Sequence, residues 1–511
     1  MKFKTFLVGC LGGLLSLNSC TNSPDMTDYA AYVNPFIGTG GHGHTFPGAI
    51  VPHGMISPSP DTRIDGWDAC SGYYYADSTI NGFSHTHLSG TGCCDYGDVL
   101  LMPTVGEQKY LPTGSQSQQM AYASAFSHQN ETAEPGYYSV FLDTYQVKAE
   151  LSANKRAAIH RYTFPESKEA GFILDLDYSL QRQTNKEMEI EVISPTEICG
   201  RKKTMYWAFD QYINFYAKFS KPFTYTLVTD SMALDDGGRL LPTCKALLHF
   251  DTTKDEQVFV KVGISAVDIE GARKNVETEI PDWDFDGIRK DARKAWNETL
   301  SKIDITTNDK NDKTIFYTAL YHTAISPNLF TDVDGRYLGM DLQVHQGDTL
   351  NPMYTIFSLW DTFRALHPLM TIIDPDLNNA FIRSLIKKHQ EGGIFPMWDM
   401  ASNYTGTMIG YHAVPVIVDA YMKGDRNFDI QEAYRACVRA AEYDTTGIKC
   451  PDLVLPHLMP KAKYYKNSIG YVPCDRENES VAKALEYAYD DWCISVFADA
   501  LNDYDTRDKY A

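Results

Sequence analysis

The sequence predicts two domains of different class, an antiparallel β-sandwich followed by a helical domain. From about residue 28 to residue 275 the apolar residues recur with a period of two, as in Ile213, Phe215, Ala217 and Phe219. Many short segments of this kind, separated by turn residues and without intervening helices, indicate a large sandwich. After about residue 310 the period becomes helical. A chain of 511 residues can bury a core of this size in two or three domains.

The individual elements follow in order along the chain. Residues 187–192 and 258–264 alternate and predict half-buried strands, whereas 172–176 is apolar throughout and predicts a more buried one. An apolar face from Phe285 to Ile303 predicts a helix that links the domains. The helices expected after it are 313–325, 361–373, 375–389, 406–422, 428–444 and 478–501.

The N-terminus has the pattern of an export signal. Lys2 and Lys4 precede an apolar run over residues 6–17, and the sequence Leu-Asn-Ser-Cys ending at Cys20 resembles a bacterial lipobox. Cys20 is therefore predicted to carry a lipid that anchors an exported lipoprotein to a membrane, in the periplasm or at the cell surface. An ordinary cleaved signal peptide is the alternative.

Charge and composition exclude some partners. A net charge of −20 argues against nucleic acid, because the phosphates would be repelled. Aromatic residues make up 13% of the chain, which would suit a polyhydroxylated ligand. The 11 cysteines, two of them in the signal, show no metal-ligand spacing, and export permits one or two disulfides.

Residues 32–98 differ from the rest of the chain. They contain five of the 14 histidines and 12 of the 35 glycines. Glycine lets the backbone approach a ligand closely, and histidine, tryptophan and aspartate on such loops are typical of a polar small-molecule site. Turn-rich β-structure with hydrogen-bonded histidines is the alternative.

Several segments, in this order, resemble glycoside hydrolase family 92. They are residues 34–40 (NPFIGTG), 52–55 (PHGM), 66–68 (GWD), 82–90 (GFSHTHLSG), 358–364 (SLWDTFR), 408–412 (MIGYH) and 485–492 (LEYAYDDW). The resemblance implies a calcium-dependent exo-α-mannosidase that inverts the anomeric centre. It also implies a β-sandwich followed by an (α/α)6 barrel, for which this chain has about half of the helices.

The predicted organisation combines the two lines of reasoning. It comprises a lipoprotein signal peptide (1–20), a tether (21–27), the sandwich (28–278), a linker helix (279–309) and a partial (α/α)6 barrel (310–511). The resemblance places the catalytic acid, the base and the calcium ligands beyond residue 511, so no catalytic or metal-binding residue is assigned. The last helices are expected to expose apolar faces.

Five residues are predicted to bind the sugar. Trp67 could stack on a sugar ring while Asp68 accepts hydroxyl hydrogen bonds, although Trp67 could instead be a buried interdomain residue. Trp360 and Asp361 are assigned to the site through the family resemblance, and Arg364 could hold Asp361 in place. A helix N-cap for Asp361 and an ordinary ion pair for Arg364 are the alternatives.

Other polar pairs are interpreted as structural. His85 and His87 could chelate a metal, but no third ligand is evident. The pairs Glu477/Glu479 and Asp490/Asp491 are not assigned as acid and base.

The sequence thus predicts a family member that removes terminal α-linked mannose, with α-1,2 linkages expected, from glycans. The alternatives are a non-catalytic mannoside-binding remnant and an unstable truncated gene product.

Overall fold

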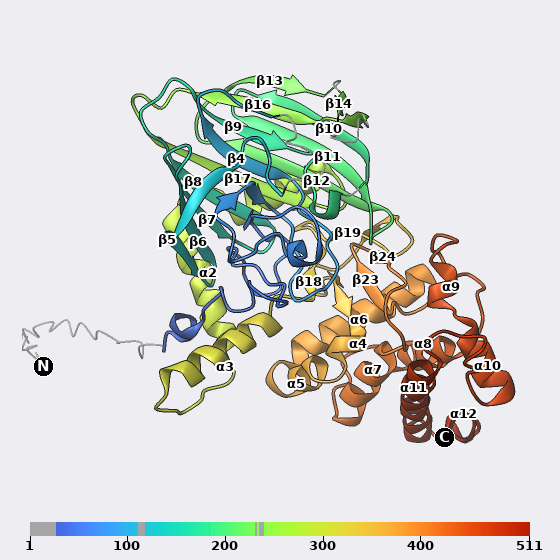
Figure 1. Ribbon diagram of the computed structural model, residues 1–511. Helices are drawn as coiled ribbons and strands as arrows, with labels where there is room; N and C mark the ends of the chain where they lie inside the picture. Colours follow the sequence, from blue (N-terminus) through green and yellow to red (C-terminus); the bar gives the residue numbers. More distant parts are fainter. Residues whose placement is uncertain (1–26, 111–117, 183, 230–231, 235–239) are drawn as a thin grey trace, which may run out of the picture.

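The computed structural model describes residues 27–110, 118–182, 184–229, 232–234 and 240–511, and it shows an antiparallel β domain followed by a helical domain (Figure 1). The predicted signal peptide, Cys20 and the tether up to residue 26 lie outside the described residues. Within the described part of the chain, no helix is both long and apolar enough to cross a bilayer.

Two antiparallel sheets form the first domain, as predicted. The first has six strands in the order β1 (Ser59–Asp61), β3 (Gly82–Ser84), β4 (Leu100–Val105), β9 (Ala170–Asp175), β16 (Lys245–Phe250) and β13 (Thr224–Val228). The second has nine, in the order β10 (Thr184–Ser194), β11 (Glu197–Met205), β12 (Gln211–Phe219), β17 (Gln257–Ser265), β8 (Ala157–Thr163), β7 (Val147–Ala153), β6 (Tyr137–Leu142), β5 (Ser124–Glu134) and β2 (Thr79–Ile80). Strands β14 (Met232–Leu234) and β15 (Leu240–Pro242) form a separate pair.

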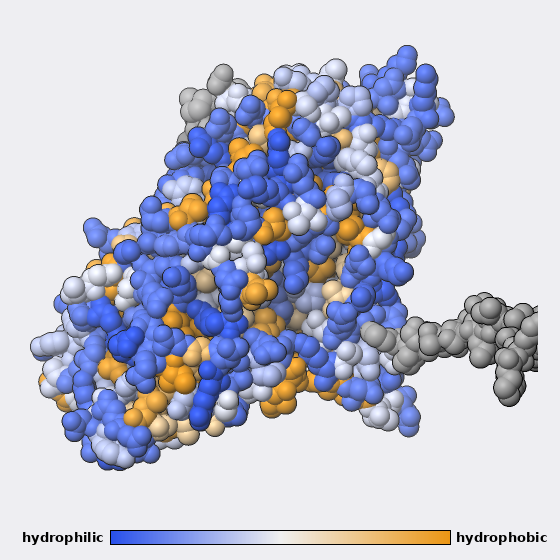
Figure 2. All heavy atoms as spheres, turned by 180° about the vertical axis from the view of Figure 1, so that it is seen from behind, coloured by the Kyte–Doolittle hydropathy of each residue, from blue (hydrophilic) through white to orange (hydrophobic). Residues whose placement is uncertain are grey.

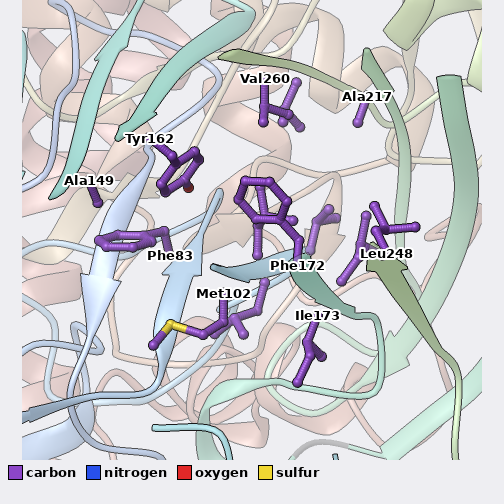
Figure 3. Close-up of a cluster of buried hydrophobic side chains, with 14 of the residues drawn as sticks. Phe83, Met102, Ala149, Tyr162, Phe172, Ile173, Ala217, Leu248 and Val260 are labelled. Atoms are coloured by element: carbon purple, nitrogen blue, oxygen red, sulfur yellow. The ribbon is translucent and has the colours of Figure 1, made fainter. Parts of the chain in front are cut away.

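The main hydrophobic core contains side chains from both sheets (Figure 3). Phe172 of β9 packs edge-on against Tyr162 of β8, with ring centroids 4.9 Å apart, and both side chains are fully buried. Val260 and Ala217 of the nine-stranded sheet belong to the same cluster. The period of two in the sequence arises because alternate residues face this core.

Strand β12 is buried on both faces, which its alternating sequence did not predict. Tyr216, on the outward face, packs in a second cluster with Ala272 and Val276 of helix α1 (Ile269–Glu279). Helix α1 overlaps the last residues of the range predicted for the sandwich, 28–278, and ends one residue beyond it. It begins at an N-cap, Asp268, whose side chain accepts the backbone N–H of Gly271.

Helices dominate the second half of the chain, with three small sheets among them. The helices are α2 (Phe285–Leu300), α3 (Lys310–Thr323), α4 (Leu359–Thr362), α5 (Leu366–Ile373), α6 (Pro375–Gly392), α7 (Ala413–Met422), α8 (Ile430–Ala441), α9 (Leu455–Leu458), α10 (Lys461–Ile469), α11 (Ser480–Ala500) and α12 (Tyr504–Tyr510). The sheets are β18 (Asn328–Leu329) with β21 (Tyr354–Thr355), β19 (Arg336–Leu338) with β20 (Val344–Gln346), and β22 (Phe357–Ser358) with β23 (Trp398–Met400) and β24 (Asn403–Tyr404).

The predicted linker helix and the six later helices all correspond to observed helices, with three differences. The segment predicted as one helix over 361–373 is two helices, α4 and α5, separated at residues 363–365. The helix predicted to start at residue 406 starts at Ala413. Helices α9 and α10 were not predicted, because their short sequences are rich in Pro, Lys and Tyr and lack a clear apolar stripe.

Helix α11 exposes an apolar stripe, as expected for the last helices. Val481, Leu485, Tyr489 and Trp492 are spaced to lie on one helical face, and all four are exposed. The face of the molecule seen from behind is mostly hydrophilic with scattered apolar patches (Figure 2). An apolar helix face of this kind is typical of a surface that another element covers.

His85 and His87 are buried structural residues. His85 lies with Nδ1 2.6 Å from the Val99 carbonyl oxygen, and its Nε2 is 3.2 Å from Nε2 of His160 in β8. His87 contacts the Ser57 carbonyl oxygen and the Asp61 carboxylate. Both imidazoles therefore have protein partners on both nitrogens, which agrees with the structural interpretation.

We expect His85 to make the stability of the protein depend on pH. Burial lowers the pKa of His85 to about 4, whereas an unfolded histidine has a pKa of about 6.5. Between these values the unfolded chain binds a proton that the folded chain does not, so the free energy of unfolding falls as pH drops, by up to about 1.4 kcal/mol per pH unit. Urea unfolding at pH 7, 6 and 5 measures this slope.

A pair of variants measures the share of this slope that His85 contributes, since burial also lowers the pKa values of His53, His160 and His367. We expect His85→Gln to reduce the slope by up to about 1.4 kcal/mol per pH unit, which is the contribution of one proton. His249→Ala, which changes an exposed histidine of β16, should leave the slope unchanged. An equal slope in the two variants would contradict the assignment.

Candidate functional site

A cavity of about 570 Å³ lies between the loops of the sandwich and the first part of the helical domain. Its volume falls in the range of small-molecule sites, which is about 300–1,000 Å³. Among the residues that line it are Trp67, Gly92 and Trp207 from the first domain and His322, Asp361 and Trp398 from the second.

Trp67 presents an exposed aromatic ring to this cavity. It begins a short 3-10 helix, η2 (Trp67–Ala69), and 55% of its surface is exposed. Its Nε1 donates to Nδ1 of His42 at 2.8 Å, and its ring lies edge-on to His44. A Cβ atom at Gly92 would lie 2.6 Å from the ring of Trp67, so only glycine leaves room for the ring in this position. The alternative of a buried interdomain tryptophan does not hold for Trp67.

Asp361 enters the cavity from the opposite domain, in the first turn of α4. Its Oδ2 accepts the hydroxyl of Ser358 at 2.5 Å, and Oγ of Ser358 in turn accepts Nε1–H of Trp398 at 2.6 Å. Ser358, rather than Asp361, occupies the N-cap position of α4. The hydroxyl therefore orients the carboxylate while the rest of the Asp361 side chain is exposed.

The sheet β22–β23–β24 positions Ser358 and Trp398 side by side, because the two residues are register partners. The next residue, Asp399, is fully buried and accepts Nζ–H of Lys388 in α6 at 2.8 Å and the hydroxyl of Thr355 at 2.8 Å. A buried ion pair of this kind requires its hydrogen-bond partners to remain in place, so it fixes the sheet against α6.

Three of the five predicted sugar-binding residues do not line the cavity. Asp68 is not among the lining residues, and its Oδ2 lies 3.3 Å from Nη1 of Arg63. Arg364 pairs with Glu486 at 2.8 Å and not with Asp361. Its guanidinium also lies over the ring of Trp360. Of the predicted set, the structure brings Trp67 and Asp361 together in the cavity.

Sequence reasoning missed three aromatic residues of the cavity, Trp207, His322 and Trp398. The rings of Trp207 and Trp398 lie 4.3 Å apart across the two domains, and Trp207 Nε1 donates to Thr407 Oγ1. His322 donates to the Ile37 carbonyl at 3.2 Å, which leaves its Nδ1 without a partner among the described residues. Burial lowers the pKa of His322. No motif marks these positions, because they meet only through the packing of the two domains.

The carboxylate pairs near the C-terminus have structural partners. Asp490 is buried and accepts the backbone N–H of Tyr411 and Nδ1–H of His412, each at 2.8 Å. Asp491 pairs with Lys466, and Glu477 pairs with Lys483. None of these carboxylates lines the cavity, where Asp361 is the one lining carboxylate among the described residues.

The side chains of the described residues do not fit the calcium ion that the resemblance implies. Calcium takes six to eight oxygen ligands. Over the ranges that the structure covers, one group of three or more His, Cys, Asp or Glu side chains is close enough to share an ion, and it consists of His42, His44 and Asp68. Two imidazoles and one carboxylate are not a calcium cage.

Comparison with known proteins covers almost the whole described chain. Residues 32–265 match the family model described as "Glycosyl hydrolase family 92 N-terminal domain", and residues 271–511 match "Glycosyl hydrolase family 92 catalytic domain".

Solved structures of the same family are similar to this chain. A family 92 α-mannosidase from Bacteroides thetaiotaomicron is 36% identical with a TM-score of 0.86, over 94% of this chain and 64% of that one. A family 92 inverting mannosidase from the same organism is 31% identical with a TM-score of 0.81, again over 94% of this chain and 64% of that one.

A curated relative from Arthroderma benhamiae, "Uncharacterized secreted glycosidase", is 25% identical over 93% of this chain and 60% of its own length. The chain thus spans a little under two thirds of the length of these relatives. Since the two family models together match most of its residues, the chain belongs to glycoside hydrolase family 92.

Proposed function

We propose that the interdomain cavity binds terminal α-linked mannose, as part of an exo-acting α-mannosidase that hydrolyses glycans with inversion and prefers α-1,2 linkages. The relatives support this assignment, since two are mannosidases and one of these was solved in complex with mannoimidazole.

The observation that carries the proposal is that Trp67 and Asp361, from different domains, line one cavity. An exposed indole can cover the C–H face of a sugar ring, and an oriented carboxylate accepts hydrogen bonds from its hydroxyls. Nδ1 of His322 can accept a further hydroxyl, because no described residue donates to it. The cavity thus offers one apolar face and at least two polar acceptors.

Hydrolysis with inversion needs more than this cavity supplies. Its acid and its base are two carboxyl groups about 6.5–9.5 Å apart on opposite sides of the scissile bond. Asp361 is one carboxylate, and its contact with Ser358 Oγ suits it to orienting the sugar. We therefore infer that the acid, the base and the calcium ligands belong to the part of the family fold that this chain does not match. The exposed apolar stripe of α11 supports this inference, because it is suited to packing against further helices.

We expect the purified chain to bind methyl α-mannoside and α-1,2-mannobiose without releasing mannose. Isothermal titration calorimetry measures the binding, and chromatography of the mixture measures the product. Trp67→Ala should weaken binding about 2- to 10-fold, because a stacked ring contributes about 0.5–1.5 kcal/mol. Asp361→Asn should weaken it as well, because a neutral amide accepts hydroxyl hydrogen bonds less strongly than a carboxylate.

The matched control is Tyr225→Ala, which removes an exposed aromatic ring from β13, outside the cavity. Equal affinities in Trp67→Ala and Tyr225→Ala would contradict the placement of the site. Release of mannose at an enzymatic rate would instead show that the acid and the base are present in the chain. A chain without a cooperative melt by circular dichroism would favour the unstable gene product.

We further propose that the chain is exported and anchored by a lipid on Cys20. The curated relative that is named as secreted supports export, and the lipobox-like sequence supports the anchor. Metabolic labelling with palmitate in a bacterial host should mark the wild-type chain and leave Cys20→Ala unlabelled, because the sulfur atom of Cys20 would carry the lipid. Cys474→Ala, which removes an exposed cysteine, should remain labelled. Labelling of Cys20→Ala would refute the assignment.

A further inference from the structure

Three side chains of types that commonly ligate metals meet beside Trp67, which lines the cavity. His42 comes from the glycine-rich loop, His44 follows it two residues later, and Asp68 follows Trp67 in η2. Each offers one ligand atom, and the three atoms lie within 4.8 Å of one another. This spacing would allow a single ion to touch all three.

His44 has an unsatisfied ring nitrogen. The residue is only 7% exposed, and its Nε2 has no hydrogen-bond partner among the described residues. Buried polar atoms nearly always have a partner in the protein or in ordered water, so this nitrogen calls for an explanation. A metal ion is one group that an imidazole nitrogen commonly binds.

The other two candidate metal ligands, Asp68 and His42, have contacts that would still let each of them bind an ion. Asp68 uses Oδ2 to accept from Arg63, while its Oδ1 lies 3.9 Å from Nδ1 of His42. The His42 side chain is 78% exposed, so its ring has room to turn. Its Nδ1 accepts Nε1–H of Trp67, and an ion bound at that nitrogen would replace the indole.

We propose that His42, His44 and Asp68 form a binding site for a divalent transition-metal ion of the zinc class. Two imidazole nitrogens and one carboxylate oxygen are a common set of three ligands for zinc, with water as the fourth. Calcium and magnesium prefer oxygen donors, so the site selects against them. Binding at His42 Nδ1 would release Trp67, which lines the cavity, so the ion would change the cavity wall.

The test is calorimetry with ZnCl₂ on the untagged chain, without a polyhistidine sequence and with excess Ca²⁺ present. We expect one tight zinc ion per chain. His42→Ala and Asp68→Asn should each weaken zinc binding at least about 10-fold, since even loss of an outer partner of a ligand costs about 10- to 100-fold. His249→Ala, which removes an exposed histidine elsewhere on the surface, should bind zinc like the wild type.

Two further readouts separate ligation from unfolding. His42→Ala changes an exposed side chain, so its melting temperature without zinc should match that of the wild type. In the wild type, zinc should change the tryptophan fluorescence, because Trp67 loses its bond to His42, and His42→Ala should lack this change. Absence of zinc binding, or equal zinc affinity in His42→Ala, Asp68→Asn and His249→Ala, would overturn the proposal. None of these measurements requires a sugar, so they fail independently of the proposed mannoside binding.

Discussion

A buried contact between His87 and Asp61 holds the loops of the first domain together. Nε2 of His87 lies 2.8 Å from Oδ1 of Asp61, and neither side chain is accessible to solvent. Nδ1 of His87 lies 2.7 Å from the Ser57 carbonyl oxygen, so one imidazole connects three segments of the chain. Gly72 packs over the same carboxylate. A Cβ there would lie 2.1 Å from Asp61 Oδ1, and its φ of +79° also favours glycine.

This contact explains how a loop-rich segment can provide one wall of the cavity. Loops can present functional side chains only when a rigid scaffold positions them. The turn that carries Trp67 lies between Asp61 and Gly72, and the loop that carries Gly92 follows His87. The buried contacts of Asp61, Gly72 and His87 therefore hold both parts of the wall in place. The glycines and histidines that make residues 32–98 unusual thus serve the packing of the loops as well as the cavity.

The second wall depends on a different buried pair, Lys388 with Asp399. It ties the sheet that carries Ser358 and Trp398 to helix α6. Trp398 then meets Trp207 of the first domain, and both rings line the cavity. Each wall is held by its own buried contacts, and the cavity lies where the two domains pack together.

The sequence predicted the individual strands and helices better than the way they pack together. The strands of the sandwich were predictable from the sequence because alternate residues face one core. Most helices were predictable from their apolar faces. Burial of the outward face of β12 was not, because it depends on α1 packing against it. Among the site residues, Trp67 and Asp361 stand in recognisable motifs, whereas Trp207 and His322 do not. Arg364 shows the limit of sequence spacing, since it lies one turn from Asp361 and yet pairs with Glu486, 122 residues away.

By itself, the sequence determined the order of the two domains, the family to which they belong, and two of the residues that line the cavity, Trp67 and Asp361, because local patterns and motifs encode all three. Only the tertiary structure decided which side chains share the cavity, which histidines are buried, and that His42, His44 and Asp68 meet. The physical reason is that these contacts join segments through packing and hydrogen bonds that no local pattern records. The same side chain has partners on both ring nitrogens at position 87 and an unpartnered ring nitrogen at position 44, and only the surroundings of each imidazole tell the two apart.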